Sequence, residues 1–295
     1  MSTIAGARPR RARSRAARTA RAGWLLSLPS ITVMVLLTLA PLVSVVIGAI
    51  SADGWERLQQ LIEAPGFTQT LRNTAVWVVV GTVGSLLVGL AGALALQHPT
   101  VRLTGLWRSV LLIPWITPTV VAATAWKWFY SRDYGLLNAL LLEVGVVDEP
   151  VSWLTNTSIA LYAVVAVHVW ATFSFVMLMT SAGLAAIPAE LYEAARMDGA
   201  GALRSFLSIT LPSIRDILFI VTLIVTVWTL NSFLPVWIMT KGGPAGATNI
   251  VPVQLYQYFQ LGDRTAIYVL AAFQLAFSVA IAALYVRQTR KEDAA

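Results

Sequence analysis

Residues Ala189–Pro212 read AELYEAARMDGAGALRSFLSITLP, a polar stretch set between two long apolar segments. The stretch is helix-prone, and prolines bound it at Pro188 and Pro212. The surrounding chain offers such an amphipathic helix little water-facing protein to pack against. The stretch therefore predicts a docking site for a separate protein.

The composition is that of a chain crossing a membrane several times. Of its 295 residues, 57% are hydrophobic and 12% are charged, whereas soluble domains carry about 25% charged residues. Cysteine is absent, which excludes disulfides, thiol catalysis and Cys-ligated metals. His98 and His168 are too far apart in sequence for a local metal motif, so no metal site is predicted.

Six apolar segments predict an all-α membrane protein with six transmembrane helices, because each reaches the roughly 20 residues that a bilayer core requires. The predicted spans cover approximately residues 24–50, 73–96, 106–130, 157–186, 214–239 and 265–286, within a membrane domain of residues 23–287. The first span is too long for the apolar core of a signal peptide and is expected to remain uncleaved. Residues 1–22 are predicted to be a disordered Arg-rich tail and 288–295 a second tail, with loops at 51–70, 131–156 and 240–264.

Positive charge predicts the orientation. Fifteen Lys and Arg residues lie in the N-terminal tail, residues 97–108, residues 187–215 and the C-terminal end, against five in or next to the three alternate loops. The positive-inside rule then places both termini and the 189–212 loop in the cytoplasm of a bacterial or archaeal cell, with the chain in its plasma (inner) membrane. Seven arginines within the first 21 residues are explained by this orientation signal, so no nucleic-acid partner is predicted.

Two sequence patterns predict how the spans pack. Gly81, Ser85, Gly89 and Ala93 recur every four residues and would form a small-residue face that lets another helix approach closely. In the third span, the two prolines of IPWITP (113–118) free backbone carbonyls, which is tolerated where protein or a watery cavity surrounds the break.

The chain lacks the motifs of an enzyme or ATPase, and no catalytic residue is predicted. No phosphate-binding loop is possible at Lys127, Lys241 or Lys291, since Trp, Gly and Glu follow them. No Asp or Glu lies in the interior of a predicted span, which counts against an ion-coupled secondary transporter and favours energy supplied by another chain. There are two alternatives. One is the ion-coupled secondary transporter, and the other is a membrane enzyme that acts on lipid-linked sugars with Asp133 or Glu143 as its acid.

The polar residues inside the spans are uncharged and mixed with aromatic rings. They comprise Thr119, His168, Thr172, Thr229, Asn231, Ser232 and Gln274, with Trp115, Trp126, Phe175 and Trp228 nearby. Such a set suits an uncharged polyol such as a sugar, because hydroxyls pair with neutral donors and acceptors while ring C–H faces stack on aromatics. The alternative for His168 is a hydrogen bond between two helices.

The opening stretch also carries a family motif. Glu193-Ala194-Ala195, Gly199 and Ile209-Thr210-Leu211-Pro212 resemble, at full spacing, the EAA loop of ABC-transporter permeases. The pair Asp198-Gly199 is expected to end one helix in a left-handed turn, with a second helix running through Phe206. The resemblance implies ATPase-coupling residues at Glu190, Glu193, Ala194, Ala195, Asp198, Gly199, Ile209, Leu211 and Pro212. The alternative is an amphipathic loop resting on the membrane surface.

Further motifs resemble carbohydrate ABC permeases, most closely the first permease of a maltose/glycerol-phosphate-type importer. They are Asn73-Thr74, IPWITP, Gly135-Leu136-Leu137-Asn138, Trp153-Leu154, AIPAELYEAARMDGA and Thr240-Lys241-Gly242-Gly243-Pro244. The resemblance implies the type I ABC importer permease fold, a heterodimer with a second permease in membrane lipid, two ATP-binding cassette subunits and an external solute-binding protein. ATP and Mg²⁺ would bind the partner subunits, and this chain would bind no cofactor. An importer class for amino acids or phosphate-bearing solutes is a further alternative.

The same resemblance implies where the sugar is held. The implied contacts are Trp115 and Thr119 from IPWITP, then His168, Ala171, Thr172 and Phe175, then Thr229 and Ser232 with Asn231 beside them. Several differ from the maltose-type side chains: His replaces Asn, Thr replaces Gly, Phe replaces Tyr and Thr replaces Asn. The substrate is therefore expected to be a sugar or polyol without maltose being specified, and in some relatives only one permease of the pair holds it.

Overall fold

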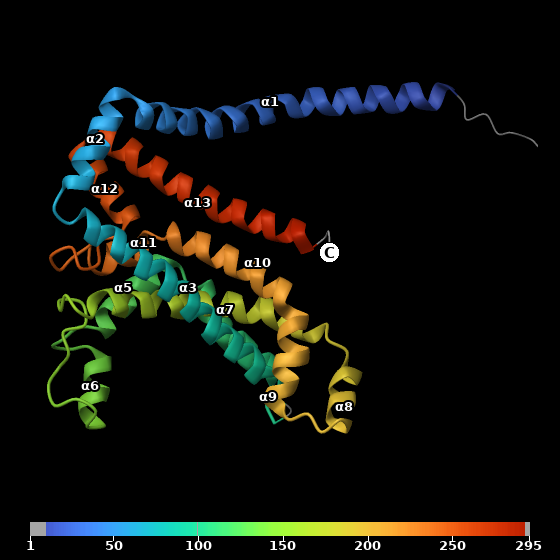
Figure 1. Cartoon of the computed structure of the whole chain (residues 1–295), viewed down its shortest axis with the longest axis vertical. Coiled ribbons are helices and arrows are strands. Elements are labelled where there is room, and N and C mark those ends of the chain that lie inside the picture. The colour runs from blue at the N-terminus through green and yellow to red at the C-terminus, as the bar shows by residue number, and fades with distance from the viewer. Residues whose placement is uncertain (1–9, 99, 293–295) are drawn as a thin grey trace, which may run out of the picture.

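The computed structural model describes residues 10–98 and 100–292, and in this part of the chain all regular structure is helical (Figure 1). The helices are α1 (Arg10–Ile50), α2 (Ala52–Glu63), α3 (Phe67–Gln97), α4 (Thr104–Ile116), α5 (Thr119–Phe129), α6 (Leu136–Glu143), α7 (Ala160–Ala185), α8 (Ala189–Met197), α9 (Ala202–Ser205), α10 (Leu211–Leu230), α11 (Leu234–Met239), α12 (Val251–Leu261) and α13 (Arg264–Glu292). A π-helical turn, Phe206–Thr210, joins α9 to α10.

Five helical stretches are long and apolar enough to cross a membrane. They are Ser27–Ile50, Phe67–Gln97, Ala160–Ala185, Ala202–Met239 and Arg264–Tyr285. The pair α4 and α5 passes the same test together but is bent by 94°, so it is the sixth span if the pair crosses as one. The all-helical architecture is confirmed, and these stretches overlap the six segments that the sequence predicts to be spans.

The break in the third span follows from proline chemistry. Proline disfavours the helical conformation of the residue before it, and Thr117, which precedes Pro118, is extended with ψ 126°. The Thr117 hydroxyl donates to the Ile113 carbonyl at 2.7 Å, and Ser174 on α7 donates to the Leu111 carbonyl at 2.6 Å. Side-chain hydroxyls of Thr117 and Ser174 thus make additional hydrogen bonds to helix carbonyls beside the break.

Helices α3 and α7 pack closely along the small-residue face. Gly81, Ser85, Gly89 and Ala93 are all buried. A Cβ atom at Gly89 would lie 2.5 Å from the Val176 Cβ, and one at Gly81 would lie 3.0 Å from the Thr229 Cγ2. The predicted helix-packing role of these small residues is confirmed.

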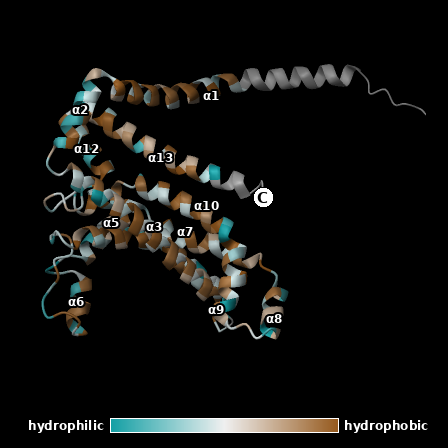
Figure 2. Cartoon of the chain, in the orientation of Figure 1, coloured by the Kyte–Doolittle hydropathy of each residue, from teal (hydrophilic) through white to brown (hydrophobic). Residues whose placement is uncertain are grey.

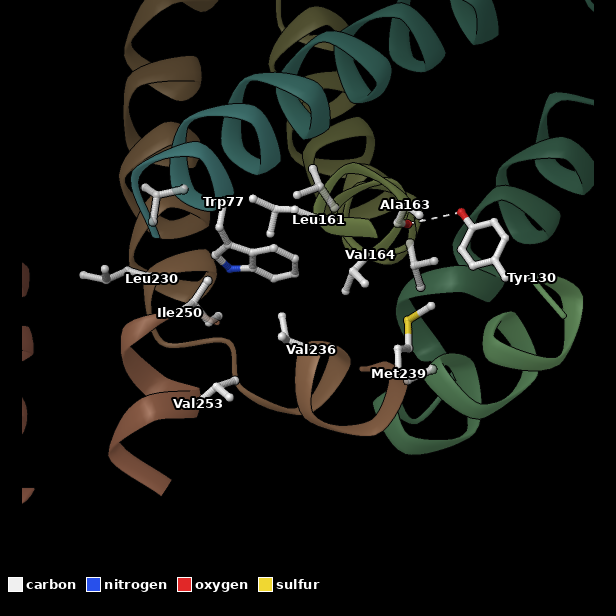
Figure 3. Packing of buried hydrophobic residues seen from close by; sticks show 14 residues of the cluster. Trp77, Tyr130, Leu161, Ala163, Val164, Leu230, Val236, Met239, Ile250 and Val253 are labelled. Atoms are coloured by element: carbon white, nitrogen blue, oxygen red, sulfur yellow. Dashed lines mark hydrogen bonds between the residues drawn. The ribbon is translucent and has the colours of Figure 1, made fainter. Parts of the chain in front are cut away.

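The largest cluster of buried apolar residues surrounds Trp77 of α3. Figure 3 shows its indole among Leu161, Leu230, Val236 and Ile250, which belong to four different parts of the chain. The Trp77 Nε1–H also donates to the Thr229 carbonyl at 2.8 Å. This cluster fixes α3, α7, α10 and α11 around one centre.

The segments predicted to be loops at 51–70, 131–156 and 240–264 contain the helices α2, α6 and α12, so this part of the prediction is wrong. Helix α2 begins at the N-cap Ser51, whose side chain accepts from the Gly54 N–H at 3.1 Å, and buries Leu61. The Arg57 side chain of α2 also pairs with Asp263 at 2.6 Å. These helices are short and are stabilised by contacts with distant segments.

The expected tails also differ from the structure. Helix α1 begins at Arg10, within the stretch predicted to be disordered, and α13 runs to Glu292 instead of ending near residue 286. Arg and Ala are strong helix formers, so an Arg- and Ala-rich stretch adjoining a helix can continue it. The prediction for residues 1–9 and 293–295 lies outside the described residues.

The helices that connect the spans lie at two sides of the molecule. Helices α2, α6 and α12 lie toward one side in Figure 1, and α8 and α9 lie toward the other. Figure 2 shows apolar residues along α1, α7, α10 and α13, with polar residues gathered at α2 and around α8 and α9. This distribution is typical of an apolar bundle with polar ends.

Candidate functional site

The coupling segment, Ala189–Pro212, projects from the bundle as two short helices. Helix α8 has no buried residue, and Met197 is 88% exposed. Glu190, Glu193 and Ala194 are exposed and Ala195 is half-buried. Within the described residues, the chain itself therefore leaves this surface uncovered.

The turn after α8 is the one that the sequence predicts. Gly199 has φ +74°, a region that glycine adopts without steric penalty. The Ala200 N–H donates to the Ala195 carbonyl at 2.8 Å, and the Gly199 N–H donates to the Arg196 carbonyl at 3.1 Å. These two bonds form a Schellman motif. Asp198 and Gly199 therefore set the angle between the two short helices.

The second half of the coupling segment is continuous with the fifth span. Helix α9 passes through the π turn into α10, where Pro212, which has no N–H to donate, lies in the first turn. Ile209 and Leu211 are half-buried. The hydroxyls of Tyr192 and Thr210 are 2.9 Å apart and tie α8 to this helix. Helix α8 is thus joined to α10 by one hydrogen bond and one π-helical turn.

Three aromatic rings from separate helices lie side by side in the predicted substrate region. The ring centroids of Trp115 and Phe175 are 5.7 Å apart, and those of Phe175 and Trp228 are 4.7 Å apart. Trp115 and Trp228 are each 44% exposed. The structure therefore brings α4, α7 and α10 together at an open aromatic surface.

His168 and Thr229, by contrast, lie inside the bundle. The His168 Nε2 and the Thr229 Oγ1 are 2.9 Å apart, and the Thr229 hydroxyl also approaches the Val225 carbonyl at 2.7 Å. The single hydroxyl proton can serve only one acceptor, so donation to Val225 requires His168 to donate from Nε2. The Trp77 ring packs at 4.9 Å from the imidazole. This buried pair, called the interior pair below, has the geometry of the helix-to-helix alternative.

The remaining predicted contacts are divided between open and buried positions. The Asn231 side chain is exposed and accepts from the Gln274 side chain at 2.8 Å. Thr119 is exposed, Ala171 and Ser232 are half-buried, and Thr172 is buried. Sequence reasoning did not identify Trp77 or Tyr192, since their partners are distant in sequence and no local pattern marks them.

Among the described residues, no group of three or more His, Cys, Asp or Glu side chains is arranged to hold a metal ion. Asp216, the acidic residue within α10, is exposed and pairs with its neighbour Arg215 at 3.2 Å. What the described chain offers is a polar and aromatic surface within a membrane bundle and a separate exposed coupling segment.

These features are those of a membrane-spanning transporter subunit. Residues 85–292 match the family described as binding-protein-dependent transport system inner membrane component. This chain belongs to that family. It is the inner-membrane permease subunit of a binding-protein-dependent importer, which is a transporter component and not a catalytic enzyme.

Similar proteins extend the match over most of the chain. The trehalose/maltose transport system permease protein MalF of Thermococcus litoralis is 33% identical over 288 residues, covering 93% of this chain and 96% of the relative. The sulfoquinovosyl glycerol transport system permease protein SmoG of Agrobacterium fabrum is 33% identical over 244 residues, covering 81% of this chain and 77% of the relative. Family membership decides against an ion-coupled transporter and a membrane enzyme.

Solved structures give the fold. A chain from a bacterial ABC transporter that imports the acidic polysaccharide alginate superposes with a TM-score of 0.79 at 20% identity, covering 94% of this chain and 99% of that one. The same kind of transporter, bound to a periplasmic protein carrying an alginate pentasaccharide, gives a TM-score of 0.76. The fold is that of a type I ABC importer permease.

Proposed function

We propose that this permease imports a sugar or related polyol by alternating access, driven by ATP that partner subunits hydrolyse. The relatives named for trehalose/maltose and sulfoquinovosyl glycerol transport support a saccharide cargo. The open aromatic surface of Trp115, Phe175 and Trp228 supports it as well, because pyranose C–H faces stack on such rings. The cargo arrives on the external solute-binding protein.

The exposed coupling segment is the observation that best supports this proposal. Helix α8 presents Leu191 and Met197 to its surroundings with nothing in the described chain to cover them, and exposed apolar patches mark protein interaction sites. A groove in an ATP-binding cassette subunit is the proposed partner surface, and Mg²⁺ and ATP bind there. The proposed assembly has this chain, a second permease, two such ATPase subunits and the solute-binding protein.

The proposed orientation has both termini and the coupling segment in the cytoplasm. It is supported by the excess of Lys and Arg in those regions. In this orientation α2, α6 and α12 face outward, where the solute-binding protein docks. The segment Glu190–Phe206, with Ile209, Leu211 and Pro212, then transmits movements of the ATPase subunits to α10.

The proposed substrate contacts are of two kinds. Trp115, Thr119, Phe175, Asn231 and Ser232 are open or half-open and meet the substrate first. The more buried proposed contacts are Ala171, Thr172, His168 and Thr229. The neutral donors and acceptors of both groups suit hydroxyls, so they predict a polyol and leave its identity to the solute-binding protein.

The deciding experiment is the substitution Gly199→Asp. A non-glycine residue at φ +74° costs about 1–2 kcal/mol, and a new charge would enter the docking surface. ATP-driven uptake should be lost while the protein still inserts and assembles. Gly201→Asp is the matched control, because Gly201 has φ −74° and is the N-cap of α9, where Asp is favourable. Normal uptake by Gly199→Asp, in cells lacking a second copy, would reject the coupling role.

A further inference from the structure

A concave pocket lies where the C-terminal end of α5 leads into the segments that connect the spans. It encloses about 430 Å³ between the end of α5, residues 131–134, residues 152–155 and residues 239–244. We call it the outer vestibule. Its lining includes Lys127, Tyr130, Arg132, Trp153, Thr155 and Thr240. None of its lining residues is acidic.

The buried side-chain amide of Asn138 organises the wall of the outer vestibule through hydrogen bonds. Asn138 is 2% exposed, and the two N–H groups of its Nδ2 are shared among the carbonyls of Val151 at 2.9 Å, Ser131 at 3.3 Å and Arg132 at 3.4 Å. Its Oδ1 accepts from the Val151 N–H and from the Trp153 Nε1–H, each at 3.0 Å. Asn138 thus holds the Trp153 ring and the Arg132 backbone in fixed positions.

The wall also contains a stacked aromatic pair. The rings of Tyr130 and Trp153 are 5.7 Å apart with an interplanar angle of 29°. The Tyr130 hydroxyl donates to the Ala163 carbonyl of α7 at 3.2 Å, which anchors the pair to the bundle. A rigid aromatic wall beside hydroxyl groups is a surface on which a sugar ring can stack.

Two cations line the same pocket. The Lys127 Nζ donates to the Ile238 carbonyl at 3.3 Å, which uses one of the three donors of an ammonium group. The Arg132 side chain is exposed. Neither side chain forms an ion pair among the described residues. Positive charge in the vestibule is therefore available to an anion from outside the chain.

We propose that the outer vestibule binds an acidic saccharide, with Lys127 and Arg132 pairing its carboxylate and Trp153 stacking on its ring. The inference rests on the proposed function, and it narrows the cargo to a sugar with an anionic substituent. The uncharged polar residues of the predicted substrate region then meet its hydroxyls. A pocket with an aromatic wall fits a sugar ring better than it fits an isolated acidic side chain of the docking protein, which is the competing occupant.

The test uses the complete importer, purified in lipid nanodiscs, with D-glucuronate as the probe and D-glucose as its neutral match. Saturation-transfer NMR should show saturable binding of glucuronate and weaker binding of glucose. The double variant Lys127→Met with Arg132→Gln removes both cations that would pair with the glucuronate carboxylate. Loss of these charge-assisted hydrogen bonds should weaken glucuronate binding by about tenfold or more. Arg132→Gln alone should give part of that loss without touching the Lys127 contact to Ile238.

Arg264→Gln is the matched control, because it removes an exposed cation at the start of α13, outside the vestibule. Equal weakening by this control, or equal binding of glucose and glucuronate, would overturn the proposal. So would variants that bind glucuronate normally but lose stimulation of ATP hydrolysis by the solute-binding protein, since an acidic protein side chain would then be the occupant. Any of these results leaves the proposed function intact, whereas normal ATP-driven uptake by Gly199→Asp would reject the coupling role whatever the vestibule binds.

Discussion

The coupling segment and the interior pair are opposite in construction. The coupling segment is exposed, and its shape depends on residues close together in sequence, with the Schellman turn at Gly199 formed by Ala195, Arg196 and Ala200. The interior pair is buried, and its hydrogen bond joins residues 61 positions apart. The coupling segment leaves Leu191 and Met197 exposed within the described residues, whereas the interior pair forms its hydrogen bonds within this chain.

This difference predicts how each region responds to substitution. In the lipid phase, helix association depends on close packing and interhelical hydrogen bonds. Changes near the interior pair should therefore reduce folding or stability before they alter transport. Changes in the coupling segment should leave folding intact and separate ATP hydrolysis from uptake.

Gly89→Val should have the largest effect on the interior. A Cβ at Gly89 would lie 2.5 Å from the Val176 Cβ and 2.8 Å from the Phe173 carbonyl oxygen. Because the carbonyl belongs to the backbone, α3 and α7 would have to separate, and overpacking of this kind costs about 1–3 kcal/mol or more. We expect a lower thermal midpoint and little folded protein in size-exclusion profiles. Gly105→Val is the control, since nothing lies within 4 Å of a Cβ there; equal behaviour of the two variants would refute the close contact.

Thr229→Val against Asn231→Ala separates a structural role from a substrate role. Valine keeps the shape of Thr229 but leaves the buried His168 Nε2 without its partner, which should cost about 1–3 kcal/mol. Asn231→Ala, at an exposed position, should leave the thermal midpoint unchanged and alter uptake or substrate preference.

Both thermal midpoints and initial uptake rates over several sugars are required for this comparison. A Thr229→Val variant with unchanged stability and altered preference would make the interior pair a direct substrate contact. Unchanged uptake by Asn231→Ala would remove that residue from the proposed site.

The parts of the fold that the sequence predicts are those with local causes. Apolar length marks the six spans, Pro118 marks the break between α4 and α5, and Gly199 marks the left-handed turn. The small-residue face was also predictable, because a four-residue repeat places its members on one side of a helix. Each of these signals lies within a few residues of its effect.

The parts that were missed depend on distant residues. The segments of α2, α6 and α12 were predicted to be loops because they carry polar, acidic or turn residues between the spans. Helix α2 is held by the Arg57–Asp263 ion pair, whose partners are 206 positions apart. Trp77 reaches Thr229, 152 positions away, so no window of sequence connects them. Asn138 belonged to a recognised motif, yet its role as the organiser of the vestibule wall follows only from bonds to Val151 and Trp153.

Tyr192→Phe should have the smallest effect, and it tests whether the coupling segment also depends on a contact outside its own turn. It removes only the hydroxyl that meets the Thr210 Oγ1 at 2.9 Å, a contact worth about 0.5–1.5 kcal/mol. Because Thr210 lies in the π turn that leads into α10, the loss should loosen the connection between α8 and the fifth span. Uptake should then fall a few-fold relative to ATP hydrolysis, with the thermal midpoint nearly unchanged; Tyr162→Phe, at an exposed position on α7, is the control. If the uptake-to-hydrolysis ratio of Tyr192→Phe equals that of the control, movement passes to α10 through the Gly199 turn alone, and the coupling segment depends entirely on its local geometry.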